Sequence, residues 1–369
     1  MNATAYRLRD EANIPSPALV FYLGKMEENI QAAIQMAGSA SRLWPHIKTH
    51  KSADMTRLLM AHGISRFKCA TIAEAQMLAE VGAEHILLAY PLVGPNVRRF
   101  LALIDRYPDS AFYAIGDDEG SLRALSDAAA SQGRAVNTLL DVNMGMNRTG
   151  IATAQAPALY AACARMPGLT LRGIHGYDGH HLNPDFVKRC EQVKEAMAAL
   201  NEAMDQIKAQ GLPCEVLVLA GTPSFPCHAR HQQGYLSPGT VFLMDHGYHA
   251  KFPDLPFTPA AALLTRVVSH PAEGLFTLDL GSKAIATDPA GQRGIILGLS
   301  QAQPVLHSEE HWVWRMPEGD ACPAIGQVQY VIPTHICPTV ALYDRALVAK
   351  DGKIITAWLI TARNRRLDI

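Results

Sequence analysis

Short apolar runs alternate with amphipathic, alanine-rich segments through the first two thirds of the chain. Between residues 18 and 221 the apolar runs are ALVFYL, LWPHIK, RFKCA, HILLAY, AFYAIG, VNTLLDV, LRGIHGY and EVLVLAG. Their β-branched and aromatic content predicts eight strands. The segments between them have helix signals: Thr71 and Glu74 have the spacing of a capping box, and Gly82 would end the helix that they start.

Eight β/α units favour a closed barrel. Strands that are apolar along their whole length need helices over their outer face, as in a parallel barrel. The competing fold is an open, doubly wound sheet, but no GxGxxG turn follows the first run, as it would in a dinucleotide-binding sheet. We therefore expect an α/β protein with a (β/α)8 TIM-type barrel over residues 17–250.

The pattern changes after residue 250. LLTRVVSH, LFTLDLG, GIILG, HWVWRM, QVQYVIP and ALVAKDGKIITAWLI predict strands, the last of them a hairpin that turns at Asp351 and Gly352. These residues predict a C-terminal β-rich domain over 251–369. Residues 1–16 lie outside the barrel repeat, and we expect them to pack on this domain.

Composition narrows the class of protein. With 49% hydrophobic residues, 18% charged residues and a net charge of -1, the chain is globular and has no electrostatic footprint of nucleic-acid binding. It has no signal-peptide pattern and no apolar stretch that could cross a bilayer, so we expect a cytoplasmic protein with no membrane partner. Its seven cysteines lack the spacing of a disulfide scaffold and predict mostly reduced thiols, with Cys69, Cys163, Cys190 and Cys214 as buried apolar groups.

A basic segment ends the second predicted strand. Residues 45–51 read PHIKTHK, and alternation in an extended chain places Lys48 on the opposite side from Ile47. Active sites of β/α barrels lie at the carboxyl ends of the strands, so Lys48 would point into the barrel mouth. Desolvation lowers the pKa of a lysine there and makes its amine nucleophilic toward an aldehyde. The alternative is that Lys48 and Lys51 are both solvated, as most lysines are.

PHIKTHK resembles the cofactor-lysine segment of the D-threonine aldolase and D-serine dehydratase family. Further segments match this family in the same order, namely DVNMGMNRTG, GIHGYDGHH, AGT, SPGTVFLMD and PTHICPTVALYD. The family belongs to the fold-type III enzymes, which resemble one another in an alanine-racemase-like barrel followed by a β-domain. The resemblance implies pyridoxal 5′-phosphate as cofactor, Lys48 as its Schiff-base lysine, and a homodimer.

The resemblance also implies a cofactor site at several strand ends. Arg148 is similar to the arginine beside the pyridine nitrogen, although two more residues separate it from Asp141 than in the aldolases, and a surface salt bridge is the alternative. Tyr177 would contact the ring or the substrate, or else lie in the core. The phosphate would be bound by hydroxyl and backbone N–H groups of Gly221, Thr222, Ser237, Gly239 and Thr240.

A His-x-Cys pair gives the clearest local signal in the last third. In a strand, His335 and Cys337 would face the same side and offer an imidazole and a thiolate to one ion. Without the resemblance such a pair is more often structural; with it, we expect a divalent metal. Cysteine resembles the dehydratase branch and favours zinc, whereas the aspartate of the aldolases would suit manganese or magnesium. Glu310 and His311 would either join the metal shell or lie in a solvated loop.

Asp178 stands where the aldolases resemble one another in having a histidine proposed to act on the substrate hydroxyl. We expect Asp178 or His181 to serve as the catalytic base, with His180 as a neighbouring alternative and a solvated surface position as the other interpretation of both histidines.

These features predict a metal-dependent lyase acting on D-3-hydroxy amino acids. A metal on the β-hydroxyl would promote either aldol cleavage to glycine and an aldehyde, or loss of hydroxide to give a 2-oxo acid and ammonia, as in dehydration of D-serine or D-3-hydroxyaspartate. Cys337 and Asp178 favour dehydration, but PTHICPTVALYD as a whole favours the aldolases, and we expect that reaction. A racemase of this fold would need a second acid/base and no metal, and a non-catalytic cofactor carrier would lack the β-domain.

Overall fold

The computed structural model describes residues 2–231 and 233–369. The chain forms two compact units, which we describe separately. Residues 33–48, 56–239 and 364–369 form the barrel unit, and residues 1–32, 49–55 and 240–363 form the β unit. No helix in the described part of the chain is long and apolar enough to span a membrane.

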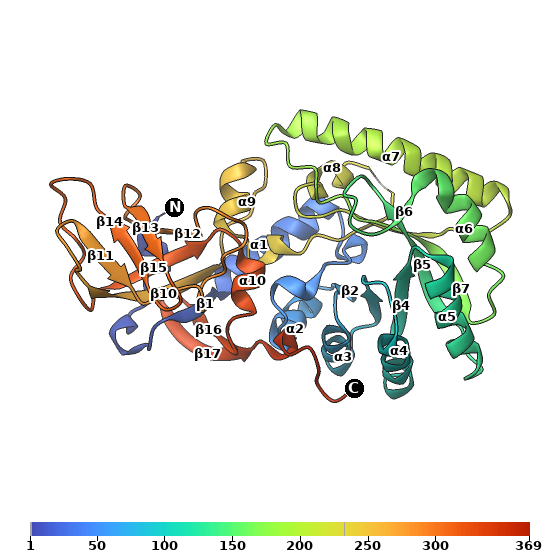
Figure 1. Ribbon diagram of the computed structural model, residues 1–369, viewed down its shortest axis with the longest axis horizontal. Helices are drawn as coiled ribbons and strands as arrows, with labels where there is room; N and C mark the ends of the chain where they lie inside the picture. Colours follow the sequence, from blue (N-terminus) through green and yellow to red (C-terminus); the bar gives the residue numbers. More distant parts are fainter. Residues whose placement is uncertain (1, 232) are drawn as a thin grey trace. The chain divides into compact units, whose positions relative to one another are not determined.

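The barrel unit contains a ring of parallel strands (Figure 1). Neighbouring strands pair in the order β2-β3-β4-β5-β7-β8-β9, and the short β6 (Ile151–Ala152) pairs with β5. Their bounds are Arg66–Cys69, His85–Leu88, Ala111–Gly116, Val136–Asn143, Leu169–Gly176, Val216–Leu219 and Tyr235–Leu236. Leu43 bridges to Leu236 and His46 bridges to Lys68, both in parallel. Residues 43–46 therefore close the ring between β9 and β2, and the predicted barrel architecture is confirmed.

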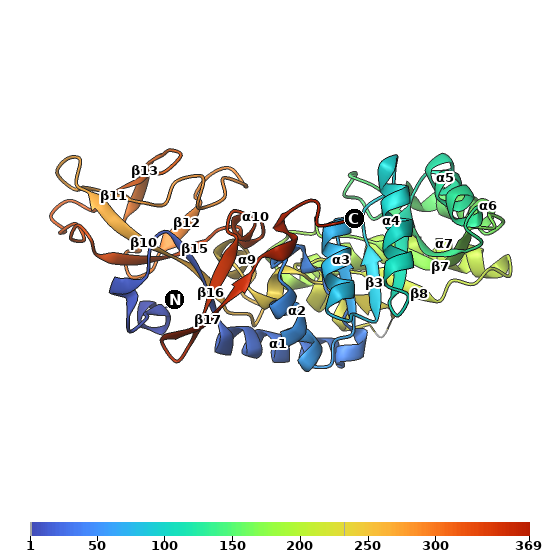
Figure 2. The ribbon, with the colours of Figure 1, turned by 90° about the horizontal axis from the view of Figure 1, so that it is seen from below.

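Helices cover the outside of this ring (Figure 2). They are α3 (Ile72–Glu80), α4 (Pro95–Arg106), α5 (Glu119–Ala130), α6 (Ala156–Cys163), α7 (Phe186–Ala209) and α8 (Phe225–Ala229). Helix α3 begins at the predicted capping box: Glu74 N–H donates to Thr71 Oγ1 at 3.1 Å, and the Glu74 carboxylate accepts from Ala70 N–H at 2.6 Å. Helices α1 (Leu23–Ala37) and α2 (Ala53–Ala61) include residues of both units.

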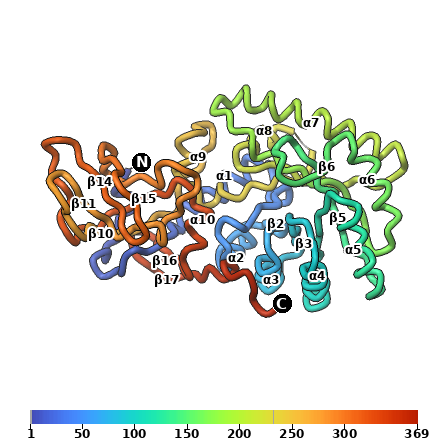
Figure 3. The backbone as a smooth tube through the Cα atoms, viewed as in Figure 1, coloured from blue at the N-terminus to red at the C-terminus, as the bar shows by residue number. Residues whose placement is uncertain are grey.

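The C-terminal residues of the chain return to the barrel unit (Figure 3). Arg106 Nη1 lies 2.7 Å from the Asp368 carboxylate, and Arg99 Nη2 donates to Ile369 O at 2.7 Å. Residues 364–369 are thus held against α4. Exposed ion pairs of this kind add little stability on their own.

The β unit contains a nine-stranded sheet. Its path is β13-β14-β11-β10-β1-β16-β17, and β15 pairs with β10 and β12. The bounds of β1 and β10 to β17 are Ala18–Tyr22, Ala261–Ser269, Leu275–Leu278, Gly294–Ile296, Gln303–His307, Trp312–Arg315, Val328–Pro333, Arg345–Lys350 and Lys353–Leu359. The hairpin between β16 and β17 turns at Asp351 and Gly352, where both residues have positive φ (50° and 73°), as predicted. Two short helices, α9 (His246–Lys251) and α10 (Ile336–Val340), belong to the same unit.

One predicted barrel strand belongs to this sheet instead. ALVFYL, expected as the first barrel strand, forms β1, which pairs with β10 in antiparallel and with β16 in parallel. Four of the five β1 residues are buried, so the run has the same continuous apolar pattern as a barrel strand. Its local sequence therefore predicts a buried strand correctly but contains no information about which sheet it joins.

Candidate active site

The side chain of Tyr177 lies directly after the end of β7. Tyr177 follows Gly176, the last residue of that strand. A Cβ atom on Gly179 would lie 2.0 Å from Tyr177 Oη, and one on Gly221 would lie 3.1 Å from Tyr177 Cε2. The two glycines therefore allow the loops after β7 and β8 to close around the ring.

Three cationic side chains surround this ring. Lys48 Nζ lies 5.8 Å from the ring centroid, Lys68 Nζ lies 5.6 Å away, and Arg148 Cζ lies 4.9 Å away. These separations fall within the range of cation–π attraction. The structure thus brings the predicted residues Lys48, Arg148 and Tyr177 together. We call these four side chains the Tyr177 cluster.

Lys68 was not predicted as a site residue. It lies on β2, is 2% exposed and has the apolar Phe67 and Cys69 as neighbours in the chain. Burial first, and then the charge of Lys48, lower the pKa of Lys68 to about 7. A lysine in the middle of an apolar strand is itself unusual, and this was the available sequence signal.

A second feature that the sequence did not indicate is a buried His–Asp pair. Asp141 on β5 and His175 on β7 occupy paired positions, and His175 Nδ1 lies 2.7 Å from Asp141 Oδ1. Burial lowers the pKa of His175, and the hydrogen bond with Asp141 opposes this effect. Within the described residues, His175 Nε2 and Asp141 Oδ2 are buried without a hydrogen-bond partner. The pair therefore presents one unsatisfied nitrogen and one unsatisfied oxygen, which a bound ligand could satisfy.

Asp178 is fully buried between two partners. Its carboxylate accepts from Ser224 Oγ at 2.5 Å and lies 2.6 Å from His228 Nε2. Burial by itself would raise the pKa of Asp178, but the charge and hydrogen bond of His228, with the hydrogen bond of Ser224, hold that pKa below its usual value. Ser224 Oγ also accepts from Gly221 N–H at 3.0 Å. Asp178 therefore ties the loop after β7 to the loop after β8, and its predicted role as a base stays a prediction.

The two histidines that follow Asp178 stack on each other. The rings of His180 and His181 have centroids 4.1 Å apart. Burial lowers the pKa of His181, against the opposing charge of Asp178. Its Nε2 is buried without a partner among the described residues. The shift favours the neutral form of His181, and its Nε2 has no partner within the described residues, so His181 stays a candidate for the general base.

The predicted phosphate-binding residues are divided between the two units. Gly221 and Thr222 follow β8, and Ser237 and Gly239 follow the neighbouring β9. Ser237 Oγ donates its proton to Trp44 O at 2.6 Å, so its hydroxyl hydrogen is already used. Thr240 belongs to the β unit, where its hydroxyl lies 3.6 Å from Cys337 Sγ.

The predicted metal pair lies at the start of a helix and not in a strand. Strand β15 ends at Pro333, His335 is the N-cap residue of α10, and Ile336 N–H donates to Asp245 at 3.2 Å. The expected strand geometry was therefore wrong, because the chain turns after Pro333 and the Asp245 carboxylate binds the start of α10. The His335 and Cys337 side chains nevertheless share a hydrogen bond.

The contacts of His335 and Cys337 shift the pKa values of both side chains. Burial would raise the pKa of Cys337, but the hydrogen bond and charge of His335 and the hydrogen bond of Thr49, 3.2 Å from the sulfur, lower it. Burial would lower the pKa of His335, but Cys337, Asp245 and Asp288 raise it to about 9. These contacts therefore favour a proton on His335 and ease the loss of a proton from Cys337.

These donors fit half of a metal site. A thiolate and an imidazole suit a soft divalent ion, which would replace the imidazole proton on binding. The described residues contain no group of three or more His, Cys, Asp or Glu side chains placed to hold a metal. Glu310, a further candidate, instead lies 3.1 Å from the Lys283 ammonium in an exposed ion pair. The protein therefore offers two donors, and other ligands would have to complete the coordination.

A disulfide joins two helices of the barrel unit. Cys190 on α7 and Cys227 on α8 are bonded, with Cα atoms 5.1 Å apart. This corrects the expectation that Cys190 is a free, buried apolar group, because the spacing of cysteines along the chain does not show which helices pack together. Cys69, Cys163 and Cys214 are buried and form no disulfide, as predicted.

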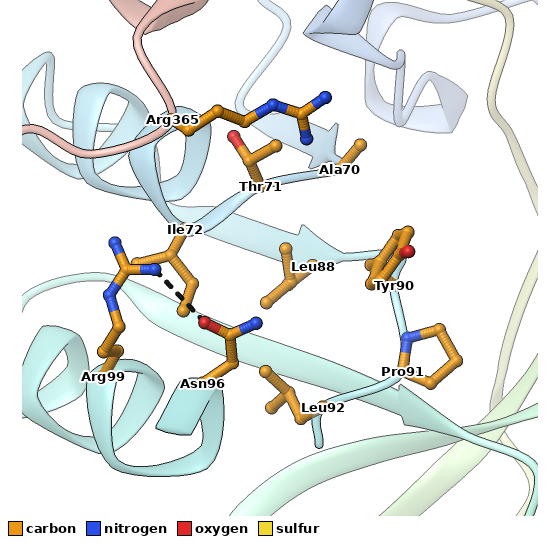
Figure 4. A pocket seen from close by; sticks show the side chains of 10 residues that line it. All are labelled: Ala70, Thr71, Ile72, Leu88, Tyr90, Pro91, Leu92, Asn96, Arg99 and Arg365. Atoms are coloured by element: carbon orange, nitrogen blue, oxygen red, sulfur yellow. Dashed lines mark hydrogen bonds between the residues drawn. The ribbon is translucent and has the colours of Figure 1, made fainter. Parts of the chain in front are cut away.

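A pocket of about 250 Å³ lies beyond the carboxyl ends of β2 and β3 (Figure 4). Ile72, Leu88 and Leu92 give it apolar walls, and Arg99 and Arg365 contribute positive charge. It contains none of the predicted site residues. Its lining comes from the end of β3, the starts of α3 and α4 and the residues before these helices, with Arg365, and includes no residue of the Tyr177 cluster.

Comparison with known proteins places the chain in a family. Residues 22–246 match the family of the alanine racemase N-terminal domain, and residues 260–349 match the putative serine dehydratase domain. The chain belongs to the alanine racemase N-terminal domain family, whose fold-type III members depend on pyridoxal phosphate. The resemblance inferred from PHIKTHK and the later segments is confirmed.

Two curated relatives and one solved structure extend this similarity over nearly the whole chain. The D-threonine aldolase of Arthrobacter sp. is 27% identical over 95% of this chain and 93% of its own length. The D-threo-3-hydroxyaspartate dehydratase of Delftia sp. is 25% identical over 93% of this chain and 96% of its own length. The crystal structure of D-threonine aldolase from Filomicrobium marinum has a TM-score of 0.88 and 27% identity, and covers 95% of this chain and 96% of that one.

Proposed function

We propose that this chain is a lyase dependent on pyridoxal phosphate and a divalent metal, and that it cleaves D-3-hydroxy amino acids to glycine and an aldehyde. One observation carries the proposal: Lys48 and Arg148 both approach the Tyr177 ring at the strand ends of a parallel barrel. The similarity to D-threonine aldolases over nearly the whole chain supports the same reaction.

The residues of the barrel unit fit the cofactor. Lys48 would hold it covalently, Arg148 would lie beside the ring nitrogen, and Tyr177 would contact the ring. Backbone N–H groups of Thr222 and Gly239 would bind the phosphate, because the Gly221 N–H already donates to Ser224 Oγ. When bound, pyridoxal phosphate supplies an electron sink for the negative charge that develops on Cα. The unsatisfied Nε2 of His175 is consistent with a polar ligand in this space.

The β unit would supply the metal ligands. His335 and Cys337 would hold the ion, for which a thiolate favours zinc over manganese or magnesium. A divalent ion there would act as a Lewis acid toward the substrate's β-hydroxyl. Thr49 Oγ1 contacts Cys337 Sγ at 3.2 Å, and Thr49 directly follows the cofactor lysine in the chain.

His181 is the better placed of the two predicted bases. Its Nε2 has no partner among the described residues, whereas both carboxylate oxygens of Asp178 contact Ser224 and His228. A neutral imidazole can take the β-hydroxyl proton, while Asp178 holds the loop in place.

Dehydration is the second candidate reaction. The cysteine at position 337 and the similarity to the D-threo-3-hydroxyaspartate dehydratase of Delftia sp. favour it. Both reactions would use the same residues, so the products must separate them.

One experiment tests the proposal. Metal-reconstituted protein is incubated with D-threonine and with D-serine, and acetaldehyde, glycine and 2-oxo acids are measured in the same tube. Equal amounts of acetaldehyde and glycine from D-threonine are expected. A 2-oxo acid with ammonia as the main product would establish the dehydratase instead, and no product from either substrate would disprove both. L-Threonine serves as the control for the D configuration.

The homodimer and the cytoplasmic location belong to the same proposal. Fold-type III enzymes resemble one another in forming dimers, and sedimentation of the full chain checks this point directly.

A further inference from the structure

Lys68 is a buried cation for which the proposed reaction has no role. It lies in the middle of β2, 2% exposed, with fully buried Phe67 and Cys69 on either side. Its ammonium shares the Tyr177 ring with Lys48 and Arg148. Burying a charged amine is costly unless an opposite charge compensates it.

The charges of Asp141 and Asp178 offset part of this cost, but neither carboxylate contacts the Lys68 amine directly. Within the described residues, neither Lys68 nor Arg148 forms a hydrogen bond or an ion pair with another side chain. The two nearby carboxylates have other partners: Asp141 Oδ1 contacts His175 at 2.7 Å, and Asp178 contacts Ser224 and His228. Only Asp141 Oδ2 remains unsatisfied.

In the described part of the chain, the Lys68 amine therefore lacks a hydrogen-bond acceptor, which an anionic ligand would provide. If Lys48 is used by the cofactor, Lys68 and Arg148 remain as two basic side chains, and Lys68 has the charges of Asp141 and Asp178 nearby without a hydrogen bond to either. If Arg148 contacts the ring nitrogen of the cofactor, the Lys68 amine still faces the Tyr177 ring and has no hydrogen-bond partner of its own among the described residues.

We propose that Lys68 is a binding residue of the active site and donates to an anionic oxygen beside the cofactor ring. This inference rests on the proposed function. The oxygen would belong to the ring phenolate of the cofactor or to a carboxylate of the substrate, and both present the same chemistry to an ammonium. Burial and the charge of Lys48 lower the pKa of Lys68 to about 7 in the ligand-free protein, so the amine can become charged as the anion binds.

Three variants test the role. Lys68→Met removes the charge and keeps the length of the side chain, Lys68→Arg keeps the charge, and Lys194→Met removes an exposed lysine of α7 as the matched control. The measurements are the visible absorbance spectrum of the holoenzyme, the dissociation constants of pyridoxal phosphate and glycine, and KM and kcat for D-threonine.

The two sources of the anion give different results. If the phenolate is the partner, Lys68→Met shifts the absorbance maximum without substrate and weakens cofactor binding about tenfold or more. If a substrate carboxylate is the partner, the spectrum stays the same while KM and the dissociation constant of glycine rise about tenfold or more. Lys68→Arg should recover part of either loss. A Lys68→Met protein that matches the wild type in spectrum and in both dissociation constants overturns the inference.

The ligand-free protein separates binding from a structural role. Removing a buried amine that has no hydrogen-bond partner within the described residues should leave the unfolding temperature of Lys68→Met equal to or above that of the wild type. A clear fall in that temperature, with binding losses explained by the unfolded fraction, would also overturn the inference. Borohydride-sensitive absorbance of the wild type tests Lys48 separately, so the proposed function and the role of Lys68 can fail independently.

Discussion

Lys68 of the Tyr177 cluster and His335 of the His335–Cys337 pair differ in whether they have direct partners. In the Tyr177 cluster, Lys68 and Arg148 lie beside an aromatic ring and form no ion pair with a described residue. In the β unit, the His335 imidazole shares a hydrogen bond with Cys337 and lies 3.3 Å from Asp288. Lys68 thus has carboxylates only nearby, whereas His335 has direct partners.

This difference indicates how each region would accept its ligand. Basic side chains that lack a direct partner gain from an anion, because the ligand can accept their hydrogen bonds. A protonated imidazole must instead lose its proton before a metal can bind, so metal affinity at the His335–Cys337 pair would depend on proton release. The barrel unit would thus bind an anionic group directly, whereas the β unit would bind a metal only with loss of a proton.

The largest effect is expected from Lys48, the lysine proposed to hold the cofactor. Lys48→Ala removes the amine that would hold the cofactor, and turnover should fall at least about a thousandfold. The visible absorbance that borohydride abolishes should disappear with it. Lys51→Ala is the neighbouring control and should retain both. Wild-type turnover in Lys48→Ala would refute the covalent role.

The metal pair should show the next largest effect. His335→Ala removes a ligand, and activity and bound metal should fall together by at least about a hundredfold. Cys337→Asp exchanges a soft donor for a hard one, so the variant should prefer manganese over zinc on reconstitution. Metal analysis and activity after chelation and refilling measure both. Full activity after exhaustive chelation would show that the reaction needs no metal and that the Tyr177 cluster is sufficient for it.

The third largest effect is expected from the contact between His228 and Asp178. His228→Ala leaves the fully buried Asp178 carboxylate without its 2.6 Å hydrogen-bond partner, and the free energy of unfolding should fall by about 3 kcal/mol. His228→Gln can still donate a hydrogen bond and should lose less. Urea unfolding measures both variants. Equal stability of His228→Ala and wild type would mean that Asp178 is not held as an ion.

A pH effect at Lys68 should be the smallest. Its pKa is about 7 in the folded protein and 10.5 when unperturbed, so between these values the folded state binds fewer protons than the unfolded state. Stability of the ligand-free wild type relative to Lys68→Met should therefore be lowest below pH 7 and should rise as pH increases through this window. Unfolding temperatures of the two proteins at several pH values between about 6 and 10 test this. A difference that does not change with pH would show that Lys68 is already paired.

The repeat of apolar strands and amphipathic helices was sufficient to predict the barrel, and local chemistry predicted the capping box at Thr71 and the hairpin at Asp351 and Gly352. The segment around Lys48 and the order of the later motifs predicted the family. These features are local: period, caps and turns depend on residues a few positions apart.

Tertiary structure alone decided the rest. It placed β1 in the sheet of the β unit, paired Cys190 with Cys227, and set His335 and Cys337 at the start of a helix. It also brought Lys68 beside Lys48, and His228 onto Asp178. In each case the deciding partner lies far away in the chain. An apolar run specifies that it will be buried, and a polar residue that it needs a partner, but only the packed fold determines which partner each one meets.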